Sequence, residues 1–225
     1  PRDEESADIW KGLGVTDVRY EGMEDVFWGP TGSNGPCGPT TEIYCKNSEG
    51  KDIEIWNIVF NEYFCHGTRE QLLNAPETIK LEELQFKGID TGMGFERLAM
   101  VVQGKSNIFE TDLFGELGAN RIFADHARAI TFLFADGIRP ENKGAGYILR
   151  RLLRRLLVKF DLEQIKSAVD FVIKKYSGSY PELKSVNIFE LVEKENSQFG
   201  TALELGLKEL AKVGELDNVS AFKLY

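Results

Sequence analysis

The segment at residues 27–44, FWGPTGSNGPCGPTTEIY, restricts the fold more than any other part of the sequence. It contains four glycines at every third position and three prolines between them: Gly29, Gly32, Gly35, Gly38, Pro30, Pro36 and Pro39. Glycine increases the entropic cost of ordering a helix, and proline removes a backbone donor. We therefore expect stiff, turn-rich backbone that leads into a strand at TEIY, with an ordinary surface loop as the alternative.

The chain is long and apolar enough for one large domain or two small ones. It has 225 residues, of which 42% are hydrophobic. No apolar run approaches the roughly 20 residues that a membrane span needs, so we expect no membrane association. Cys37, Cys45 and Cys65 form no CxxC pair, which favours reduced thiols in a cytoplasmic protein over a disulfide framework or a zinc site.

The pattern of apolar residues predicts an α+β fold in two parts. The run IEIWNIVFNEYF, which starts at Ile53, is rich in β-branched and aromatic residues and predicts a long strand. Residues 92–103 have helical spacing, and every long segment after Arg121 is helical in pattern. We expect a mixed domain with a sheet at residues 1–118 and an all-helical domain at residues 119–225.

The motif DTGMGFER has the pattern of a strand that passes into a helix at a ligand site. Gly92 and Gly94 would allow positive φ and the close approach of a ligand, and Arg97 would lie in the first turn of the new helix. A cation there opposes the helix dipole, which favours phosphate binding by Arg97. The alternative is a tight turn in which Arg97 pairs with a surface carboxylate. Asp90 would bind an ammonium group or cap the helix.

The segment GYILRRLLRRLLVKF concentrates positive charge in an acidic chain. The chain carries a net charge of −9, whereas residues 139–159 carry seven basic residues and one acid. Four arginines lie together beside a leucine stripe at helical spacing: Arg150, Arg151, Arg154 and Arg155. This pattern favours binding to RNA phosphates, with a face neutralised by acids of the same fold as the alternative.

Several segments, taken in order along the chain, resemble the alanyl-tRNA synthetases, a family of class II aminoacyl-tRNA synthetases. They are FWGPTGSNGPCGPTTEIY, EIWNIVFNEYF, DTGMGFERLAMVVQG, IFADHARAITFLFADGIRP, GYILRRLLRR and the final AFKLY. The resemblance spans nearly the whole chain. It implies part of the antiparallel-sheet catalytic domain of class II enzymes, followed by a helical domain that recognises tRNA.

The resemblance also implies roles for individual residues in ATP and alanine binding. Arg97 would hold the terminal phosphates of ATP and be the catalytic residue, with Gly92 and Gly94 under the nucleotide. The residues implied around alanine are Trp28 as a wall, Asn57 and Val59 on the strand, Asp90 at the ammonium group, and Gly92. Glu54 would bind Mg²⁺. Strand alternation, however, places Glu54 on the face opposite Asn57 unless a bulge intervenes.

The helical part, by the same resemblance, implies recognition of the acceptor stem of tRNA(Ala) and its G·U pair. Asn142 occupies the position of a base-pair reader, and Arg154 matches a second contact of the family. Arg150, Arg151 and Arg155 would bind phosphates.

Three departures from the family pattern indicate a fragment. The first two class II motifs have no match in the chain, AFKLY lacks the aspartate that usually follows it, and a short connector joins TDLF to RIFADH. No segment of the sequence matches the editing domain of the family. We therefore expect no alanyl-adenylate formation by this chain alone, with the missing segments on a parent chain. The alternatives are a non-catalytic acceptor-stem binding module and a structural acidic protein.

Overall fold

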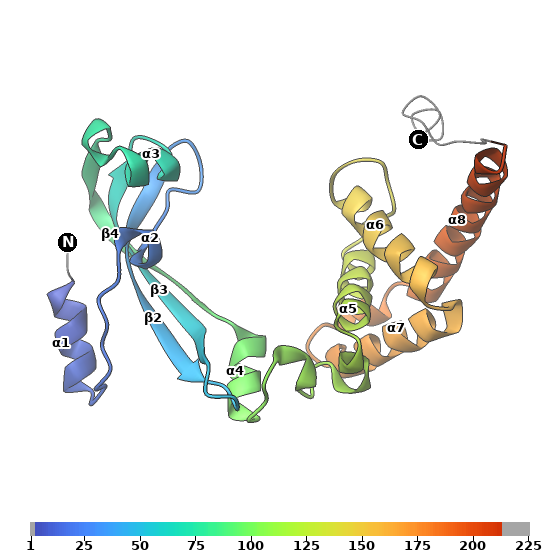
Figure 1. The fold of residues 1–225 in the computed structure, drawn as a ribbon, viewed down its shortest axis with the longest axis horizontal. Helices are drawn as coiled ribbons and strands as arrows, with labels where there is room; N and C mark the ends of the chain where they lie inside the picture. Colours follow the sequence, from blue (N-terminus) through green and yellow to red (C-terminus); the bar gives the residue numbers. More distant parts are fainter. Residues whose placement is uncertain (1–2, 213–225) are drawn as a thin grey trace. The chain divides into compact units, whose positions relative to one another are not determined.

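The computed structural model describes residues 3–212, which fall into two compact units divided between Thr111 and Asp112 (Figure 1). The AFKLY segment lies outside the described residues. The first unit is built on an antiparallel sheet and the second on helices, so the α+β fold predicted from the sequence is confirmed.

The sheet of the first unit has the strand order β1-β2-β3-β4 among the described residues. Its strands are β1 (Phe27–Trp28), β2 (Gly35–Lys46), β3 (Asp52–Cys65) and β4 (Leu81–Met93). The helices of this unit are α1 (Glu4–Gly12), α2 (Met23–Val26), α3 (Arg69–Asn74) and α4 (Phe95–Val102), with short 3₁₀ turns η1 (Pro76–Thr78) and η2 (Ile108–Glu110). Figure 1 shows β2 and β3 as a long hairpin and α4 directly after β4.

The glycine- and proline-rich segment is only partly a loop, because β2 already begins at Gly35. A Cβ atom at Gly38 would lie 1.7 Å from the carbonyl oxygen of Phe60, so β2 passes too close to β3 for any side chain. Gly29 has φ +78°, and a Cβ there would lie 2.6 Å from the carbonyl oxygen of Pro36. The glycines thus permit close approach of backbone, and the surface-loop alternative is wrong for residues 35–44.

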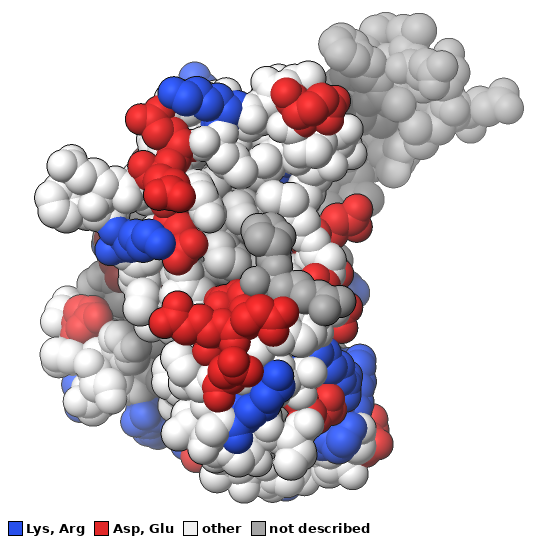
Figure 2. All heavy atoms as spheres, turned by 90° about the vertical axis from the view of Figure 1, so that its left-hand side faces the viewer, with Lys and Arg blue, Asp and Glu red and all other residues white. Residues whose placement is uncertain are grey.

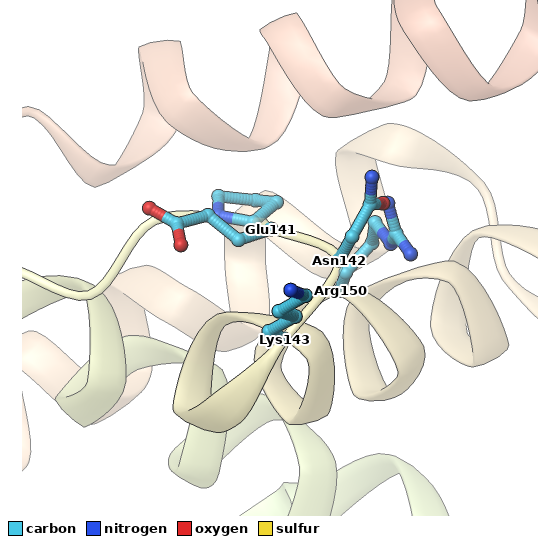
Figure 3. A pocket seen from close by; sticks show the side chains of 5 residues that line it. Glu141, Asn142, Lys143 and Arg150 are labelled. Carbon is cyan, nitrogen blue, oxygen red and sulfur yellow. The ribbon is translucent and has the colours of Figure 1, made fainter.

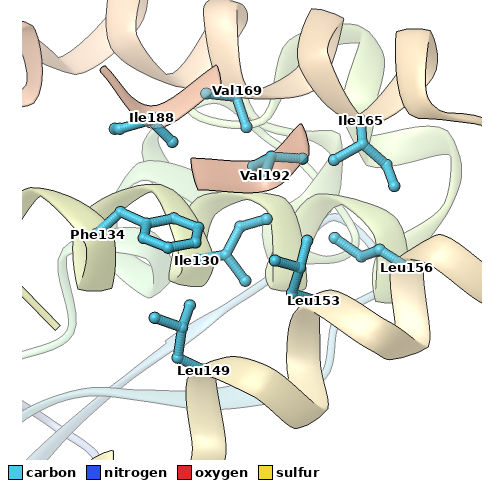
Figure 4. Packing of buried hydrophobic residues seen from close by; sticks show 9 residues of the cluster. All are labelled: Ile130, Phe134, Leu149, Leu153, Leu156, Ile165, Val169, Ile188 and Val192. Carbon is cyan, nitrogen blue, oxygen red and sulfur yellow. The ribbon is translucent and has the colours of Figure 1, made fainter. Parts of the chain in front are cut away.

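The second unit is a helical bundle around one apolar core. It comprises η3 (Gly115–Ala119), α5 (Arg121–Ala135), α6 (Gly144–Lys159), α7 (Leu162–Tyr176), η4 (Pro181–Lys184) and α8 (Ile188–Leu210). Side chains of Asn120, Asp161 and Asn187 cap the first turns of α5, α7 and α8. Leu149, Leu153 and Leu156 of α6 are completely buried against the other helices (Figure 4). The leucine stripe read from the sequence is therefore the core face of α6.

The division between the units falls earlier than the boundary expected at residues 118 and 119. Residues just after Thr111 pack on α7: the Tyr176 hydroxyl donates to the carbonyl of Leu113 at 2.8 Å, and Lys175 pairs with Asp112 at 2.8 Å. These contacts join residues far apart in sequence, so local pattern could not place them.

Two surface properties bear on function. No helix of residues 3–212 has the length and apolar character needed to cross a bilayer. On the face drawn in Figure 2, Asp and Glu side chains form continuous groups with scattered Lys and Arg. This agrees with the acidic balance of the chain outside residues 139–159.

Candidate functional site

Strand register brings together residues that the family resemblance implies around alanine. On β3 and β4, Asn57 is opposite Gly92 and Val59 is opposite Asp90. Thr40 of β2 is the other neighbour of Val59. Because alternate residues of a strand share a face, all of these positions lie on one face of the sheet. Val59 is buried, whereas Asp90 and Gly92 are exposed.

Three polar atoms on this face have no hydrogen-bond partner among the residues that the structure describes. They are Thr40 Oγ1, Asn57 Oδ1 and Asn61 Oδ1, and all three are buried. Nδ2 of Asn57 donates to Oε1 of Glu42 at 3.0 Å, and because a carboxylate accepts only, this contact fixes which way the amide faces. Buried polar atoms are normally paired with protein, water or ligand, so these three atoms around Val59 are available to bond water or a small polar ligand.

A β-bulge brings Glu54 to the same face. Ile43 pairs with Trp56 and Tyr44 pairs with Glu54, so Ile55 is an extra residue on β3. Tyr44 shares its face with Glu42, the neighbour of Asn57, and therefore Glu54 shares that face too. The bulge that strand alternation required is therefore present, and Glu54 lies on the same face as Asn57.

Arg97 lies in the first turn of α4 and contacts Glu54. Its Nη1 donates to the carbonyl oxygen of Glu54 at 2.9 Å and to Oε2 at 3.1 Å. The side chains are 51% and 34% exposed, so this is a surface ion pair. The alternative interpretation, in which Arg97 pairs with a surface carboxylate, therefore describes this structure. Its partner, Glu54, is the residue that the resemblance implies as the Mg²⁺ ligand.

The strand passes into the helix at the predicted place, with Gly92 in the strand and Gly94 at the start of the helix. β4 ends at Met93, and Gly94 is the N-cap of α4 without a side-chain cap bond. Neither Gly92 nor Gly94 has positive φ, so neither position uses the conformational freedom that glycine would allow. A Cβ at Gly92 would meet nothing within 4 Å, which leaves the backbone of the sheet accessible. Asp90 lies inside β4 and does not cap α4, so the capping alternative for Asp90 is wrong.

Trp28 is placed on β1, opposite Gly38 of β2. Gly38 comes two residues before Thr40, whose neighbour is Val59. Trp28 is 36% exposed and therefore has free surface for a contact. Thr40, Val59 and Asp90 lie side by side across β2, β3 and β4. Trp28 is opposite a residue of β2 that comes two positions before Thr40.

Glu42 and Tyr44 lie on the same face as Asn57 and Glu54, although the sequence analysis did not identify them. The Tyr44 hydroxyl donates to Oε2 of Glu42 at 2.7 Å. This hydrogen bond, with partial burial and the nearby charge of Glu54, raises the pKa of Tyr44 to about 12. Alternation along TEIY could have placed both residues on one face, but their neighbours on β3 depended on the bulge.

No group of three or more His, Cys, Asp or Glu residues that could hold a metal ion occurs within residues 3–212. Glu42 nevertheless lies two residues before Tyr44 on β2, and Glu54 is opposite Tyr44 on β3, so two carboxylates share one face. Magnesium in nucleotide sites uses one or two carboxylates and takes its other ligands from phosphates and water. The donors present therefore fit a magnesium ion that arrives with a nucleotide.

Asn142 lies in the loop before α6, at a shallow hollow of about 380 Å³ lined by Pro140, Glu141, Asn142, Lys143 and Arg150 (Figure 3). Arg150 donates to Oδ1 of Asn142, and the two side chains meet in Figure 3. A guanidinium only donates, so this contact leaves Nδ2 of Asn142 as the outward donor. The sequence identified both residues, but not their contact.

The four arginines of α6 divide by their contacts. Arg151 and Arg155 are exposed, and Arg151 stacks over Tyr147 at 5.5 Å from the ring centroid. Arg155 donates to Nε2 of His126 at 3.4 Å. Within residues 3–212, Arg154 alone of the four pairs with a carboxylate, so neutralisation by acids of the same fold applies to one arginine of the group.

The carboxylate partner of Arg154 is Glu195 of α8, which the sequence analysis did not identify. Nε of Arg154 donates to Oε1 of Glu195 at 2.7 Å, and Glu195 is 4% exposed. The signal was available: Glu195 lies three residues after Val192 and four before Phe199, within an apolar stripe of α8. An acid in such a stripe indicates a buried partner.

Comparison with known proteins covers the whole chain. The model of the family described as tRNA synthetases class II (A) matches residues 1–225. A protein of Dehalococcoides mccartyi named Alanine–tRNA ligase is 35% identical over 99% of this chain and 30% of its own length. Proteins of the same name from Thermotoga petrophila and Treponema pallidum are 37% and 36% identical and are covered over 30% and 44% of their lengths.

The chain therefore spans about 30% of the length of most of these relatives. The alignment with the Dehalococcoides protein runs over 272 positions, more than the 225 residues of the chain, so that relative has additional residues inside the matched region. The family match over every residue, the antiparallel sheet with DTGMGFER at its strand-to-helix turn, and the helical second unit agree with one another. The chain belongs to the class II (A) tRNA synthetases, the alanyl-tRNA synthetase family.

Proposed function

We propose that this chain is the part of an alanine–tRNA ligase that helps to activate alanine with ATP and recognises the acceptor stem of tRNA(Ala). Residues 1–118 would serve the first task and residues 119–225 the second. The observation that carries the proposal is the set of buried, unpaired polar atoms around Val59, next to Asp90. The names of the relatives support alanine as the amino acid.

In this proposal the sheet face holds alanine by its charged end and leaves little room for its side chain. Asp90 and Oδ1 of Asn57 accept hydrogen bonds from the ammonium group. Val59 contacts the methyl group and Trp28 closes the wall. One methylene contributes only about 1–3 kcal/mol of discrimination, so such a pocket admits glycine and serine to some degree.

ATP would lie across Gly92, where no side chain stands, with its phosphates toward the first turn of α4. Arg97 then exchanges Glu54 for phosphate oxygens. An exposed ion pair contributes at most about 1 kcal/mol, so this exchange has a low cost. Glu54 and Glu42 would hold Mg²⁺, which supplies charge neutralisation at the phosphates.

The chemistry requires positioning more than acid–base catalysis. The carboxylate of alanine attacks the α-phosphate of ATP, a P–O bond breaks, and pyrophosphate leaves. A hydroxyl of the tRNA 3′ end then attacks the carbonyl of the adenylate, and AMP leaves. Asp90 orients the nucleophile and Arg97 stabilises charge on the phosphates, which are the main contributions that such transfers need. A cytoplasmic location is expected because tRNA and ATP are used there.

On the RNA side, Asn142 would read the G·U pair and Arg154 would make a second recognition contact with the stem. Arg150, Arg151 and Arg155 would bind the backbone. Nδ2 of Asn142 is the donor left after Arg150 has engaged Oδ1, and the shallow minor groove of RNA offers acceptors on base edges. Exposed Arg151 and Arg155 supply the attraction to phosphates.

The catalytic half is tested by alanine-dependent pyrophosphate exchange in the full-length protein. Asp90→Asn removes the charge that holds the ammonium group and should raise KM for alanine by roughly 10- to 150-fold, the loss of one charge-assisted hydrogen bond. Glu83→Gln, on the same strand, is the control and should behave like the wild type. Equal effects of the two variants would remove the alanine site, and a non-catalytic stem-binding module would then explain the chain better.

The RNA half is tested by filter binding of acceptor-stem minihelices that carry either G·U or G·C. Asn142→Ala should reduce the preference for G·U, because the reading amide is gone. Lys143→Ala, on the next residue, should weaken binding to both stems alike. A wild-type chain without preference for G·U contradicts specific recognition.

A further inference from the structure

Glu195 is a buried carboxylate on α8, and it faces α6. It is 4% exposed, and its Oε1 accepts the Nε–H of Arg154 at 2.7 Å. A buried charge is strongly unfavourable without a partner, so Glu195 fixes where the guanidinium of Arg154 must lie.

Phe199 restrains the same guanidinium from a second side. It is four residues after Glu195 on α8, and the guanidinium carbon of Arg154 lies 5.0 Å from its ring centroid. Glu195 and Phe199 thus hold Arg154 from successive turns of one helix. Two contacts of different kinds restrict both the position and the plane of the group.

The contact with Glu195 uses the Nε–H of Arg154 and leaves the two Nη groups available for other partners. Nε is the bonded atom, and within residues 3–212 neither Nη of Arg154 has a hydrogen-bond partner. The side chain is 33% exposed, so these donors can reach a ligand. A guanidinium with fixed Nε and two open Nη groups is a pre-oriented donor fork.

We infer that Glu195 and Phe199 are positioning residues that hold Arg154 in the orientation in which its Nη groups contact acceptors of the RNA stem. This inference rests on the proposed function. Because Glu195 neutralises Arg154, this arginine adds little long-range attraction and acts in recognition. Arg151 and Arg155, which have no carboxylate partner within residues 3–212, supply the salt-dependent attraction.

The first experiment tests the hydrogen bond between Arg154 and Glu195 in the absence of RNA, by NMR of the arginine Nε–H groups in the intact chain. We expect one slowly exchanging Nε–H signal that is lost in Arg154→Lys and in Glu195→Ala. Glu193→Ala is the matched control, because it removes an exposed acid two residues earlier on α8 that pairs with Lys166. A protected signal that survives Glu195→Ala would show that Glu195 does not hold the guanidinium of Arg154, which overturns the inference.

The second experiment measures G·U and G·C minihelix binding at several salt concentrations. Arg154→Ala should reduce the G·U preference by roughly 5- to 150-fold with little change in salt dependence. Glu195→Ala should give the same loss, with no further loss in the double variant. Glu195→Gln keeps an acceptor for Nε and should restore the preference, while salt dependence increases because the neutralising charge is gone. Arg151→Ala should instead weaken both stems and lower the salt slope.

The outcomes separate the inference from its rivals. A lower melting temperature of Glu195→Ala with unchanged G·U preference makes the pair merely structural and overturns the inference. Tighter binding of both stems by Glu195→Ala means that Glu195 competes with RNA, which also overturns it. Phe199→Leu retains apolar packing and, if Glu195→Ala does not fold, should show a partial loss of preference. No G·U preference in the wild type rejects the proposed reading of tRNA and this inference together, whereas loss confined to Arg154→Ala rejects only the role of Glu195.

Discussion

Gly146→Ala tests whether close backbone packing holds the loop that carries Asn142. Gly146 is buried near the start of α6, and its carbonyl accepts the amide of Glu141 at 3.2 Å. A Cβ at this position would lie 2.4 Å from the carbonyl oxygen of Arg139 and 2.8 Å from Cβ of Glu141. The loop at residues 139–142 must therefore move when a methyl group is added.

The size of the effect follows from two opposing terms. An ordinary carbon–oxygen contact is about 3.3 Å, so the carbonyl of Arg139 must retreat by roughly 0.9 Å. Overpacking of this kind costs about 1–3 kcal/mol. Alanine gains up to about 1 kcal/mol of helix propensity over glycine, and less in the first turn of a helix. The steric term wins, and we expect the free energy of unfolding of the helical unit to fall by about 1–2 kcal/mol.

Urea unfolding followed by far-ultraviolet circular dichroism measures this free energy, because most helical residues belong to the second unit. The three tryptophans, Trp10, Trp28 and Trp56, belong to the first unit, so their fluorescence reports that unit separately. Gly146→Ala should shift the first signal and leave the second unchanged.

Gly200→Ala is the matched control. Gly200 also lies in a helix, α8, but a Cβ there would meet nothing within 4 Å. We expect this variant to be more stable by up to about 1 kcal/mol. If Gly146→Ala is as stable as Gly200→Ala, the packing argument is refuted. In minihelix binding, Gly146→Ala should also reduce the G·U preference, because Asn142 moves with the loop.

Three further outcomes are expected. Leu153→Ala should lower the free energy of unfolding by about 2–5 kcal/mol in urea, whereas exposed Val158→Ala should change it by less than about 0.5 kcal/mol. Iodoacetamide at a pH of about 8 should modify Cys45 before buried Cys37, because burial raises the pKa of the Cys37 thiol to about 11; mass spectrometry of peptides gives the order. Since the raised pKa means that the folded state retains this proton, the first unit should lose stability as pH rises from about 8.5 toward about 11, which tryptophan-monitored unfolding would show; constant stability over this range would contradict it.

Much of the fold could be predicted from local pattern. Apolar periodicity gave the helices after Arg121 and the long strand that starts near Ile53, because these elements are long and their period is unambiguous. The start of β2 could not be predicted in the same way. Gly35 and Gly38 look like loop residues unless the approach of Phe60 is known, and that contact joins distant residues.

The candidate site depended on register, which local sequence does not determine. Asn57 and Val59 could be placed on one face by alternation, but Glu54 could join them only through the bulge at Ile55. The partner of Arg97 was likewise invisible, because Glu54 is 43 residues earlier in the chain. The positive φ that Gly92 and Gly94 would allow is not used, because an extended strand followed by an ordinary N-cap needs none.

The most direct test of the central claim compares two glycines of β4 in the full-length protein. Gly92 and Gly88 both lie on this strand with open space at the Cβ position, but Gly92 is opposite Asn57 and Gly88 is opposite Asn61. Valine suits a strand, so neither substitution should impair folding. Gly92→Val should abolish alanine-dependent pyrophosphate exchange, because its side chain would stand where the nucleotide lies, whereas Gly88→Val should retain it. Retained exchange in Gly92→Val would contradict the account.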